Sequence, residues 1–187
     1  MVMNIVRRVM TVAVIAAVAA AVAGAVPAGA SVDKPSVESA GVMAPTAWYM
    51  IQFRHSHKCL TAPSYTIGDQ LIQQNCNAAE PSQWWGLEWI PDGSGYATFV
   101  NERTRYCINV LNSTANNAPV VQYPCIGATH EEWKGSPLSS GGYHFKNRES
   151  GKCMVVQNAR LDHNAPVIQY TCTAGDLTND EIIYIGG

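Results

Sequence analysis

The sequence lacks clusters of basic residues and carries little charge of either sign. Charged residues make up 14% of its 187 residues, and 12 Lys and Arg are scattered along the chain against 14 Asp and Glu. Binding to nucleic acid requires grouped Lys and Arg that neutralise phosphates. We therefore expect no nucleic-acid partner.

Motifs of catalysis and of metal binding are also missing. The chain has no Cys-x-x-Cys pair, no His-Glu-x-x-His sequence, no nucleophile elbow and no phosphate-binding loop. His55 and His57 would place two imidazoles on one face of a strand, but the sequence suggests no third ligand for a metal. We predict that the protein is not an enzyme and that it holds no metal and no cofactor.

Long apolar runs are absent beyond residue 30, and the one such run lies in residues 1–30. Arg7 and Arg8 precede an apolar stretch from Val9 to Val26, small residues follow up to Ala30, and no residue of this segment is acidic. The pattern predicts a secretory signal peptide cleaved after Ala30, and its Ala and Val content resembles bacterial, actinobacterial signals. An uncleaved membrane anchor is the alternative, because the stretch reaches the lower edge of a bilayer span.

Cleavage would leave a secreted, extracellular protein without membrane contact, and would change the formal net charge from −2 to −4. Residues 31–47 are rich in Ser, Val, Pro, Glu and Ala and have no aromatic side chain, so we expect a flexible linker there. The predicted domain covers residues 48–187.

The six cysteines are regularly spaced. Cys59, Cys107 and Cys153 are 48 and 46 positions apart, and second cysteines follow them after 17, 18 and 19 positions, at Cys76, Cys125 and Cys172. A period of this length indicates internal repeats, which we place at about residues 48–95, 96–141 and 142–187.

The residues around the cysteines support these repeats. A large apolar residue lies eight positions before each first cysteine, and a hydroxyl residue lies three before it. Two aliphatic residues followed by Gln precede each second cysteine. Trp84 and Trp133 lie eight positions after the second cysteine, and Ile182 is their expected counterpart in the third repeat.

The repeats also suggest how the cysteines pair. Six cysteines allow 15 pairings, but each repeat owns one cysteine of each type, so the economical pairing is Cys59 with Cys76, Cys107 with Cys125, and Cys153 with Cys172. Each bond would close a loop of roughly 18 residues and, in the chain-entropy model, would stabilise the folded state by about 3 kcal/mol.

Short apolar stretches bounded by turn residues predict an all-β domain. The stretches are rich in Val, Ile, Tyr and Trp and are separated by segments such as Pro91–Gly95 and Asn116–Pro119. No repeat of about four short strands can bury its own apolar face. We therefore expect three copies to close on each other with pseudo-threefold symmetry.

Three repeats with paired cysteines and a Gln-x-Trp-like end resemble the ricin B-type lectin family, whose fold is the β-trefoil. The steps Cys59-Leu60, Cys107-Ile108 and Cys153-Met154 match the Cys-Leu step of that family, and Gln83-Trp84 and Glu132-Trp133 fall on its closing motif. The resemblance covers about residues 48–187 and implies binding of a glycan or polysaccharide.

The family's sugar-binding positions are only partly kept in this sequence. An Asp is expected two after the first cysteine, where Thr61, Asn109 and Val155 stand. In repeat two, Tyr123 occupies the position of the stacking aromatic, and His130 and Glu131 occupy those of an Asn-Gln pair. Gln122 stands one place after the position of a nearby amide, which Val121 occupies. Repeat three keeps Tyr170, and Asp162 in its loop could compensate for Val155.

The glutamines before the second cysteines are displaced by one position from the family pattern. On a regular strand this shift turns the amide to the opposite face, unless a bulge restores it. We predict a secreted, lectin-like module with a degenerate sugar site that is best kept in repeat two. The alternative is a non-catalytic scaffold for protein–protein interaction or inhibition, with Trp84-Trp85 or residues 136–142 as its contact surface.

Overall fold

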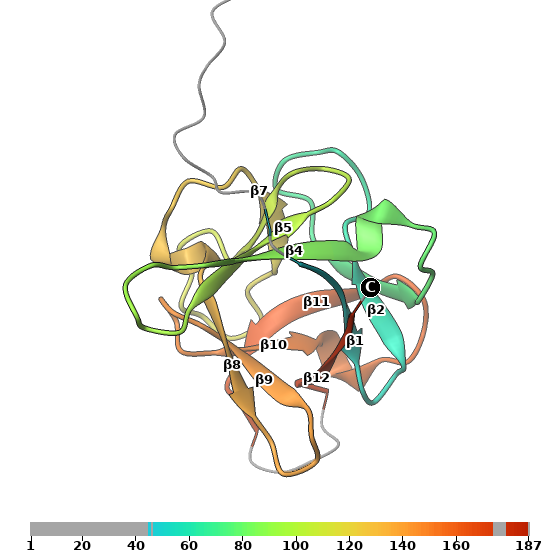
Figure 1. The fold of residues 1–187 in the computed structure, drawn as a ribbon. Coiled ribbons are helices and arrows are strands. Elements are labelled where there is room, and N and C mark those ends of the chain that lie inside the picture. The colour runs from blue at the N-terminus through green and yellow to red at the C-terminus, as the bar shows by residue number, and fades with distance from the viewer. Residues whose placement is uncertain (1–44, 46, 174–178, 187) are drawn as a thin grey trace, which may run out of the picture. The chain divides into compact units, whose positions relative to one another are not determined.

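The computed structural model describes residues 45, 47–173 and 179–186 (Figure 1). The expected signal peptide and all but two residues of the expected linker lie outside this part. No helix among the described residues is long and apolar enough to cross a membrane.

Each repeat contributes four short strands. The strands of the first are β1 (Trp48–Phe53), β2 (Lys58–Thr61), β3 (Ile72–Asn75) and β4 (Trp84–Trp89). Those of the second are β5 (Ala97–Asn101), β6 (Cys107–Asn109), β7 (Val121–Tyr123) and β8 (Trp133–Pro137). Those of the third are β9 (Tyr143–Asn147), β10 (Cys153–Val156), β11 (Ala165–Tyr170) and β12 (Glu181–Gly186). A 3-10 turn lies before β4 (η1, Pro81–Gln83), before β8 (η2, Thr129–Glu131) and after β10 (η3, Gln157–Ala159).

Six of these strands close into an antiparallel barrel. β1 pairs with β4, β4 with β5, β5 with β8, β8 with β9, β9 with β12, and β12 returns to β1. The other strands form three hairpins, β2–β3, β6–β7 and β10–β11, and neighbouring hairpins bridge one another. This barrel with three hairpins is the β-trefoil, and the predicted all-β fold with three pseudo-symmetric repeats is confirmed.

The repeated apolar positions form one core. Ile51, Phe99 and Phe145, which lie eight residues before the first cysteines, are buried, as are the residues that follow those cysteines. Phe99 and Phe145 stack with ring centroids 5.1 Å apart. Each repeat thus supplies side chains to a hydrophobic centre that no single repeat could bury alone.

The closing tryptophan of the first repeat is Trp85, one residue later than the sequence pattern suggests. Trp85 and Trp133 are both buried, and their indole nitrogens donate to the carbonyl oxygens of Leu60 (3.1 Å) and Ile108 (3.0 Å), at equivalent places. Trp84 is half-buried and donates to Ala78 instead. The prediction for Trp84 was therefore wrong, because the connection after Cys76 is one residue longer than that after Cys125. Ile182 is buried in the same core, as expected.

The three cysteine pairs are those expected. Cys59 binds Cys76, Cys107 binds Cys125 and Cys153 binds Cys172, and no cysteine remains free. Each bond joins the start of a hairpin to its end.

Three buried glutamines connect the repeats to one another. The amide nitrogen of Gln73 donates to the carbonyls of Arg160 and Asp162 (2.9 and 3.0 Å), and that of Gln122 donates to the carbonyls of Ser64 and Thr66 (3.0 and 2.8 Å). Gln169 does the same to the carbonyls of Ser113 and Ala115 (2.7 and 3.0 Å). Each hairpin therefore binds a loop of the preceding repeat, and the first hairpin binds a loop of the third repeat. These bonds satisfy carbonyl groups that would otherwise lack partners.

The three amides are not equally satisfied. The carbonyl oxygens of Gln73 and Gln169 accept hydrogen bonds from Ser56 and Ser150, both at 2.7 Å. The corresponding oxygen of Gln122 is buried without a partner, and Thr104 stands at the position of those serines. Repeat two is thus the least complete of the three junctions.

We predict that Gln73→Leu lowers the free energy of unfolding by about 1–3 kcal/mol, because it leaves two carbonyls and a hydroxyl unpaired. Gln122→Leu should cost less, since one polar atom of Gln122 already lacks a partner. Urea unfolding of both variants tests this order. Gln157→Leu is the control, because its half-buried side chain makes no hydrogen bond with the described residues. An equal loss in all three variants would contradict the proposed connecting role.

Candidate functional site

The register of each hairpin decides which side chains reach the surface. In the third hairpin Cys153 lies opposite Tyr170 and Val155 opposite Ile168, so these four share one face, whereas Met154 and Gln169 share the other. The inner face enters the core, and the outer face carries the positions at which sugar binding is expected. The glutamines are displaced by one position from the family pattern, and the sequence predicts that this shift turns the amides to the opposite face. The structure agrees, because Gln73, Gln122 and Gln169 all point inward.

The outer face of the third hairpin carries an open pocket of about 390 Å³. Val155 and Ile168 are buried and pack with the Cys153–Cys172 disulfide under the pocket. Tyr170 lies at its wall, and this residue is 42% exposed. Of the described residues, those that line the pocket are Asn117, Val155, Asn158, Ala159, Ile168, Tyr170, Thr171, Thr173 and Asn179.

Several amide side chains surround the Tyr170 ring. Asn179 lies just before β12, and its amide nitrogen donates to the carbonyl of Val156 (2.7 Å). Asn158 and Asn117 both have positive φ, 56° and 66°, which Asn tolerates better than most residues. Asn117 comes from repeat two, so the pocket is completed across a repeat boundary. An aromatic face beside amides can bind a ring that offers C–H groups on one side and hydroxyls at its edge.

The sequence did not single out Asn179 and Asn158. Asn179 stands three residues before Ile182, just as His130 stands three before Trp133, so the repeat alignment contained a signal for it. Asn158 gave no such signal, because its place depends on the conformation of η3.

In repeat two the expected residues are more deeply buried. Asn109 is 0% exposed, its side-chain oxygen accepts the Leu111 amide (2.6 Å), and its side-chain nitrogen has no partner among the described residues. Tyr123 and His130 are half-buried. Gln122 is buried and bound to Ser64 and Thr66, so it presents no atom to a sugar.

Glu131 is also buried, and it supports the chain after Cys125. Its carboxylate accepts the backbone amides of Ile126 (3.0 Å) and Gly127 (2.5 Å). Gln83 accepts the amide of Asn77 (2.8 Å) and Asp180 accepts that of Thr173 (2.9 Å) at the equivalent places. The shared position thus holds the backbone that follows each second cysteine.

Asp162 lies outside the pocket of repeat three. Its carboxylate pairs with the guanidinium of Arg160, at 2.9 Å from Nε, and this hydrogen bond lowers the pKa of the carboxyl. Asp162 is not among the residues that line the pocket. In this structure it therefore does not replace the Asp that the family has at the position of Val155.

Repeat one has no aromatic side chain at the position where a ring would stack on a sugar. Thr61 is buried and donates to the Cys59 carbonyl (3.0 Å). Gln74, at the position of the ring, donates to Asn164 of repeat three (2.9 Å).

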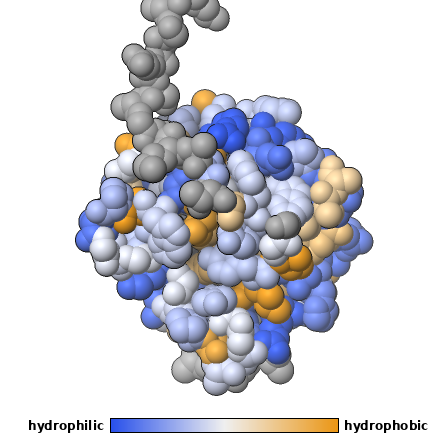
Figure 2. All heavy atoms as spheres, viewed as in Figure 1, coloured by the Kyte–Doolittle hydropathy of each residue, from blue (hydrophilic) through white to orange (hydrophobic). Residues whose placement is uncertain are grey.

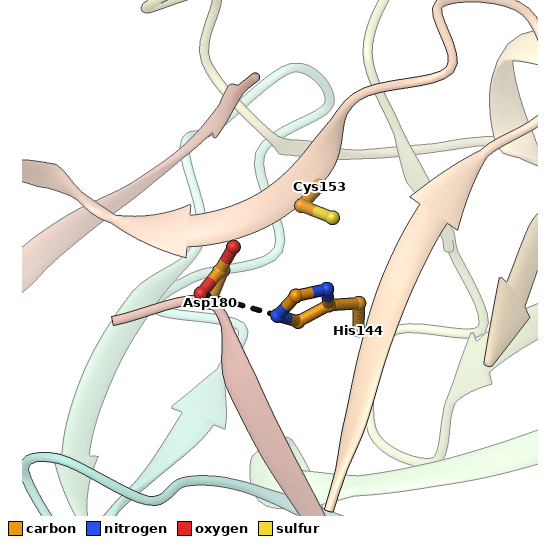
Figure 3. A group of neighbouring side chains, drawn as sticks. All are labelled: His144, Cys153 and Asp180. Atoms are coloured by element: carbon orange, nitrogen blue, oxygen red, sulfur yellow. Dashed lines mark ion pairs between the residues drawn. The ribbon is translucent and has the colours of Figure 1, made fainter. Parts of the chain in front are cut away.

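One group of potential metal ligands occurs among the described residues (Figure 3). His144, Cys153 and Asp180 are buried, with possible ligand atoms within 4.8 Å of one another. Figure 3 shows the imidazole of His144 pointing toward Asp180, and Nε2 lies 3.4 Å from Oδ1. Cys153 is bonded to Cys172 and offers no thiolate, and Asp180 already accepts two groups of Thr173. The group supports the chain next to Asn179 and is a poor metal site.

The comparisons with known proteins agree with this architecture. The family model of the ricin-type β-trefoil lectin domain matches residues 47–179. The chain therefore belongs to the ricin-type β-trefoil lectin domain family. Among curated proteins no sequence matches this chain.

Solved structures share the fold. The designed threefold-symmetric protein ThreeFoil is 31% identical, with a TM-score of 0.69 over 74% of this chain and 97% of its own. The exo-β-1,3-galactanase of Clostridium thermocellum is 23% identical, with a TM-score of 0.69 over 76% of this chain and 30% of its own. A lectin of Polyporus squamosus, solved with Neu5Acα2-6Galβ1-4GlcNAc, is 12% identical, with a TM-score of 0.64 over 77% of this chain and 50% of its own. At these identities the last two show the fold alone.

Proposed function

We propose that this protein binds glycans as a non-catalytic, lectin-like module, and that the pocket of repeat three is its main site. The exposed Tyr170 ring at the wall of an open, amide-lined pocket carries this proposal. Membership of the lectin family supports glycan binding in general, and the choice of repeat rests on the geometry of the pockets.

Repeat three is preferred over repeat two because its ring is exposed. A sugar stacks on a ring only if one face of that ring is open, and Tyr123 is more buried than Tyr170. The unpartnered amide nitrogen of Asn109 could still reach a ligand, so repeat two stays a candidate for a weaker site. The sequence favoured repeat two because it keeps Asn109, and burial reverses that preference.

Tyr170→Ala should weaken glycan binding at least tenfold, because it removes the surface on which the sugar stacks. A tenfold loss of affinity corresponds to about 1.4 kcal/mol of binding free energy. Tyr123→Ala is the matched control and should change binding less than threefold. The measurement is a glycan array with residues 31–187, followed by titration of the best ligand. Binding to no glycan would contradict the proposed function, and loss of binding only in Tyr123→Ala would move the site to repeat two.

Val155→Asp should tighten binding of the same glycan by about tenfold, since it restores a carboxylate that accepts hydrogen bonds from sugar hydroxyls. A hydrogen bond to a charged group contributes roughly 1.5 kcal/mol or more to the binding free energy. The variant should also unfold at a lower temperature, because Val155 is buried beside a disulfide. Titration and thermal unfolding separate the two effects. Val155→Thr is the control of similar size, and equal affinity of the Asp and Thr variants would exclude a role for the carboxylate.

We further propose that the protein is exported and cleaved after Ala30. The three disulfides fit an oxidising compartment. Expression of the full chain in a secreting bacterium should yield extracellular protein that begins at Ser31 by mass spectrometry. Recovery of the uncut chain in the membrane fraction would instead support an anchor.

A further inference from the structure

A second pocket lies at one end of the barrel, away from the hairpins. Its volume is about 270 Å³, and it is lined by Tyr49, Leu87, Trp89, Gly95, Gly135, Tyr143 and Tyr184. None of these residues lines the pocket of repeat three. The family's sugar-binding positions discussed above lie on the hairpins or, for His130 and Glu131, in η2, and none of them lines this pocket.

The pocket exists because the terminal layer of the barrel is unevenly filled. Each barrel strand supplies one residue to this layer, two positions beyond the core layer: Tyr49, Leu87, Ala97, Gly135, Tyr143 and Tyr184. Two of the six are small, Ala97 and Gly135. The large side chains therefore surround a hollow that they do not fill.

The tyrosines are held in fixed positions around this hollow. The ring of Tyr184 lies 5.4 Å from those of both Tyr49 and Tyr143, at interplanar angles of 61° and 62°. On its other side Tyr184 contacts the core rings Phe99 (6.4 Å) and Phe145 (5.0 Å). The aromatic surface is thus preorganised by the core, which lowers the entropy cost of binding.

The polar side-chain groups of the pocket include the hydroxyls of three tyrosines. Within the described part of the chain, no hydrogen bond engages the hydroxyls of Tyr49, Tyr143 and Tyr184, and none of these oxygens is a buried atom without a partner. The pKa of Tyr184 is raised far above its usual value, mainly by burial and to a smaller extent by the nearby Tyr143 and Tyr49. Its hydroxyl therefore stays protonated. Lys134, whose side chain lies near Gly95, donates to the Ser94 carbonyl (2.9 Å) and lies over the Tyr96 ring.

Trp89 adds an exposed indole to the pocket. It ends β4 and is 62% exposed, although tryptophan is usually well buried. Figure 2 shows, on one face of the molecule, that apolar side chains form small patches among hydrophilic ones. An exposed Trp beside three tyrosine hydroxyls is a typical surface for a ring with both C–H and O–H groups.

We propose that this barrel-end pocket binds one neutral hexopyranose unit, as a second glycan site independent of repeat three. The aromatic walls fit the C–H faces of the ring, and the three hydroxyls can donate to and accept from its O–H groups. No described residue that lines the pocket is charged, which favours a neutral ligand, and the volume matches a single sugar ring. The inference rests on the proposed function of glycan binding, but it involves residues other than those of the pocket in repeat three.

Two sites on one domain would change how the protein binds polymers. A polysaccharide that reaches both pockets is bound more tightly than by either alone, because the second contact is intramolecular. Short glycans would gain nothing from the second pocket.

The test uses residues 31–187 with Tyr170→Ala and Tyr123→Ala, which remove the ring contacts of the hairpin sites. Methyl glycosides of glucose, galactose and mannose are titrated while the indole N–H signal of Trp89 is followed by NMR. At least one glycoside should shift this signal at millimolar concentration. Trp89→Phe identifies the signal.

Two further variants locate the site. Gly135→Ala should weaken the response at least threefold, because its methyl group narrows the pocket while resting 3.4 Å from Tyr143, an ordinary contact. Tyr65→Ala, which removes an aromatic side chain of similar exposure elsewhere, should leave the response unchanged. Thermal unfolding checks that both variants fold.

A Trp89 signal that responds to no glycoside would overturn this inference, as would a response to p-cresol alone, which would mark a site for apolar rings. Neither result would affect the hairpin site, which is tested by Tyr170→Ala in the otherwise unchanged chain. Conversely, loss of the hairpin site leaves the Trp89 response intact if the barrel-end pocket binds sugar.

Discussion

The fold depends on three buried glutamine side chains that each bind the backbone of a neighbouring repeat. A single repeat has four short strands and no face that it could bury by itself, so its stability comes from its neighbours. Gln73, Gln122 and Gln169 make this dependence specific, because each amide nitrogen donates to two loop carbonyls of another repeat. Apolar contact alone would hold the repeats together but would fix their relative positions less well.

The same glutamines determine the surface of the protein. Side chains alternate along a strand, so an inward Gln169 requires Ile168 and Tyr170 to face outward. The exposed ring of the candidate sugar site is therefore a consequence of the internal connection. A shift of one residue in β11 would bury Tyr170 and expose the amide, and the repeats would lose both the connection and the site.

Much of the fold could be predicted from the sequence, because repetition multiplies weak signals. The spacing of the cysteines gave the pairing, and the apolar positions before and after them gave the core. The error at Trp84 arose where repeat one carries one extra residue, since a fixed count from Cys76 cannot detect an insertion. Trp85 is distinguished only by its indole bond to Leu60, a tertiary contact.

The candidate site was harder to predict than the fold. Tyr123 and Tyr170 occupy equivalent positions in the repeats, and the sequence gives no sign that Tyr170 is the more exposed of the two. The sequence also ranked Asn109 above Val155 by chemistry, but it could not show that Asn109 is fully buried while Val155 supports an open pocket. Asp162 looked available for a ligand, although the neighbouring Arg160 already pairs with it.

Among the described residues, no ionised side chain lines either pocket, and this restricts what these parts of the protein can recognise. A sugar that carries a carboxylate or sulfate would lose hydration on entering and would find no cationic side chain among the described lining residues. Neutral rings lose less hydration and gain stacking on Tyr170 or Trp89. Because such contacts involve no net charge, salt screens them little, so both sites should favour neutral glycans and retain binding at high ionic strength.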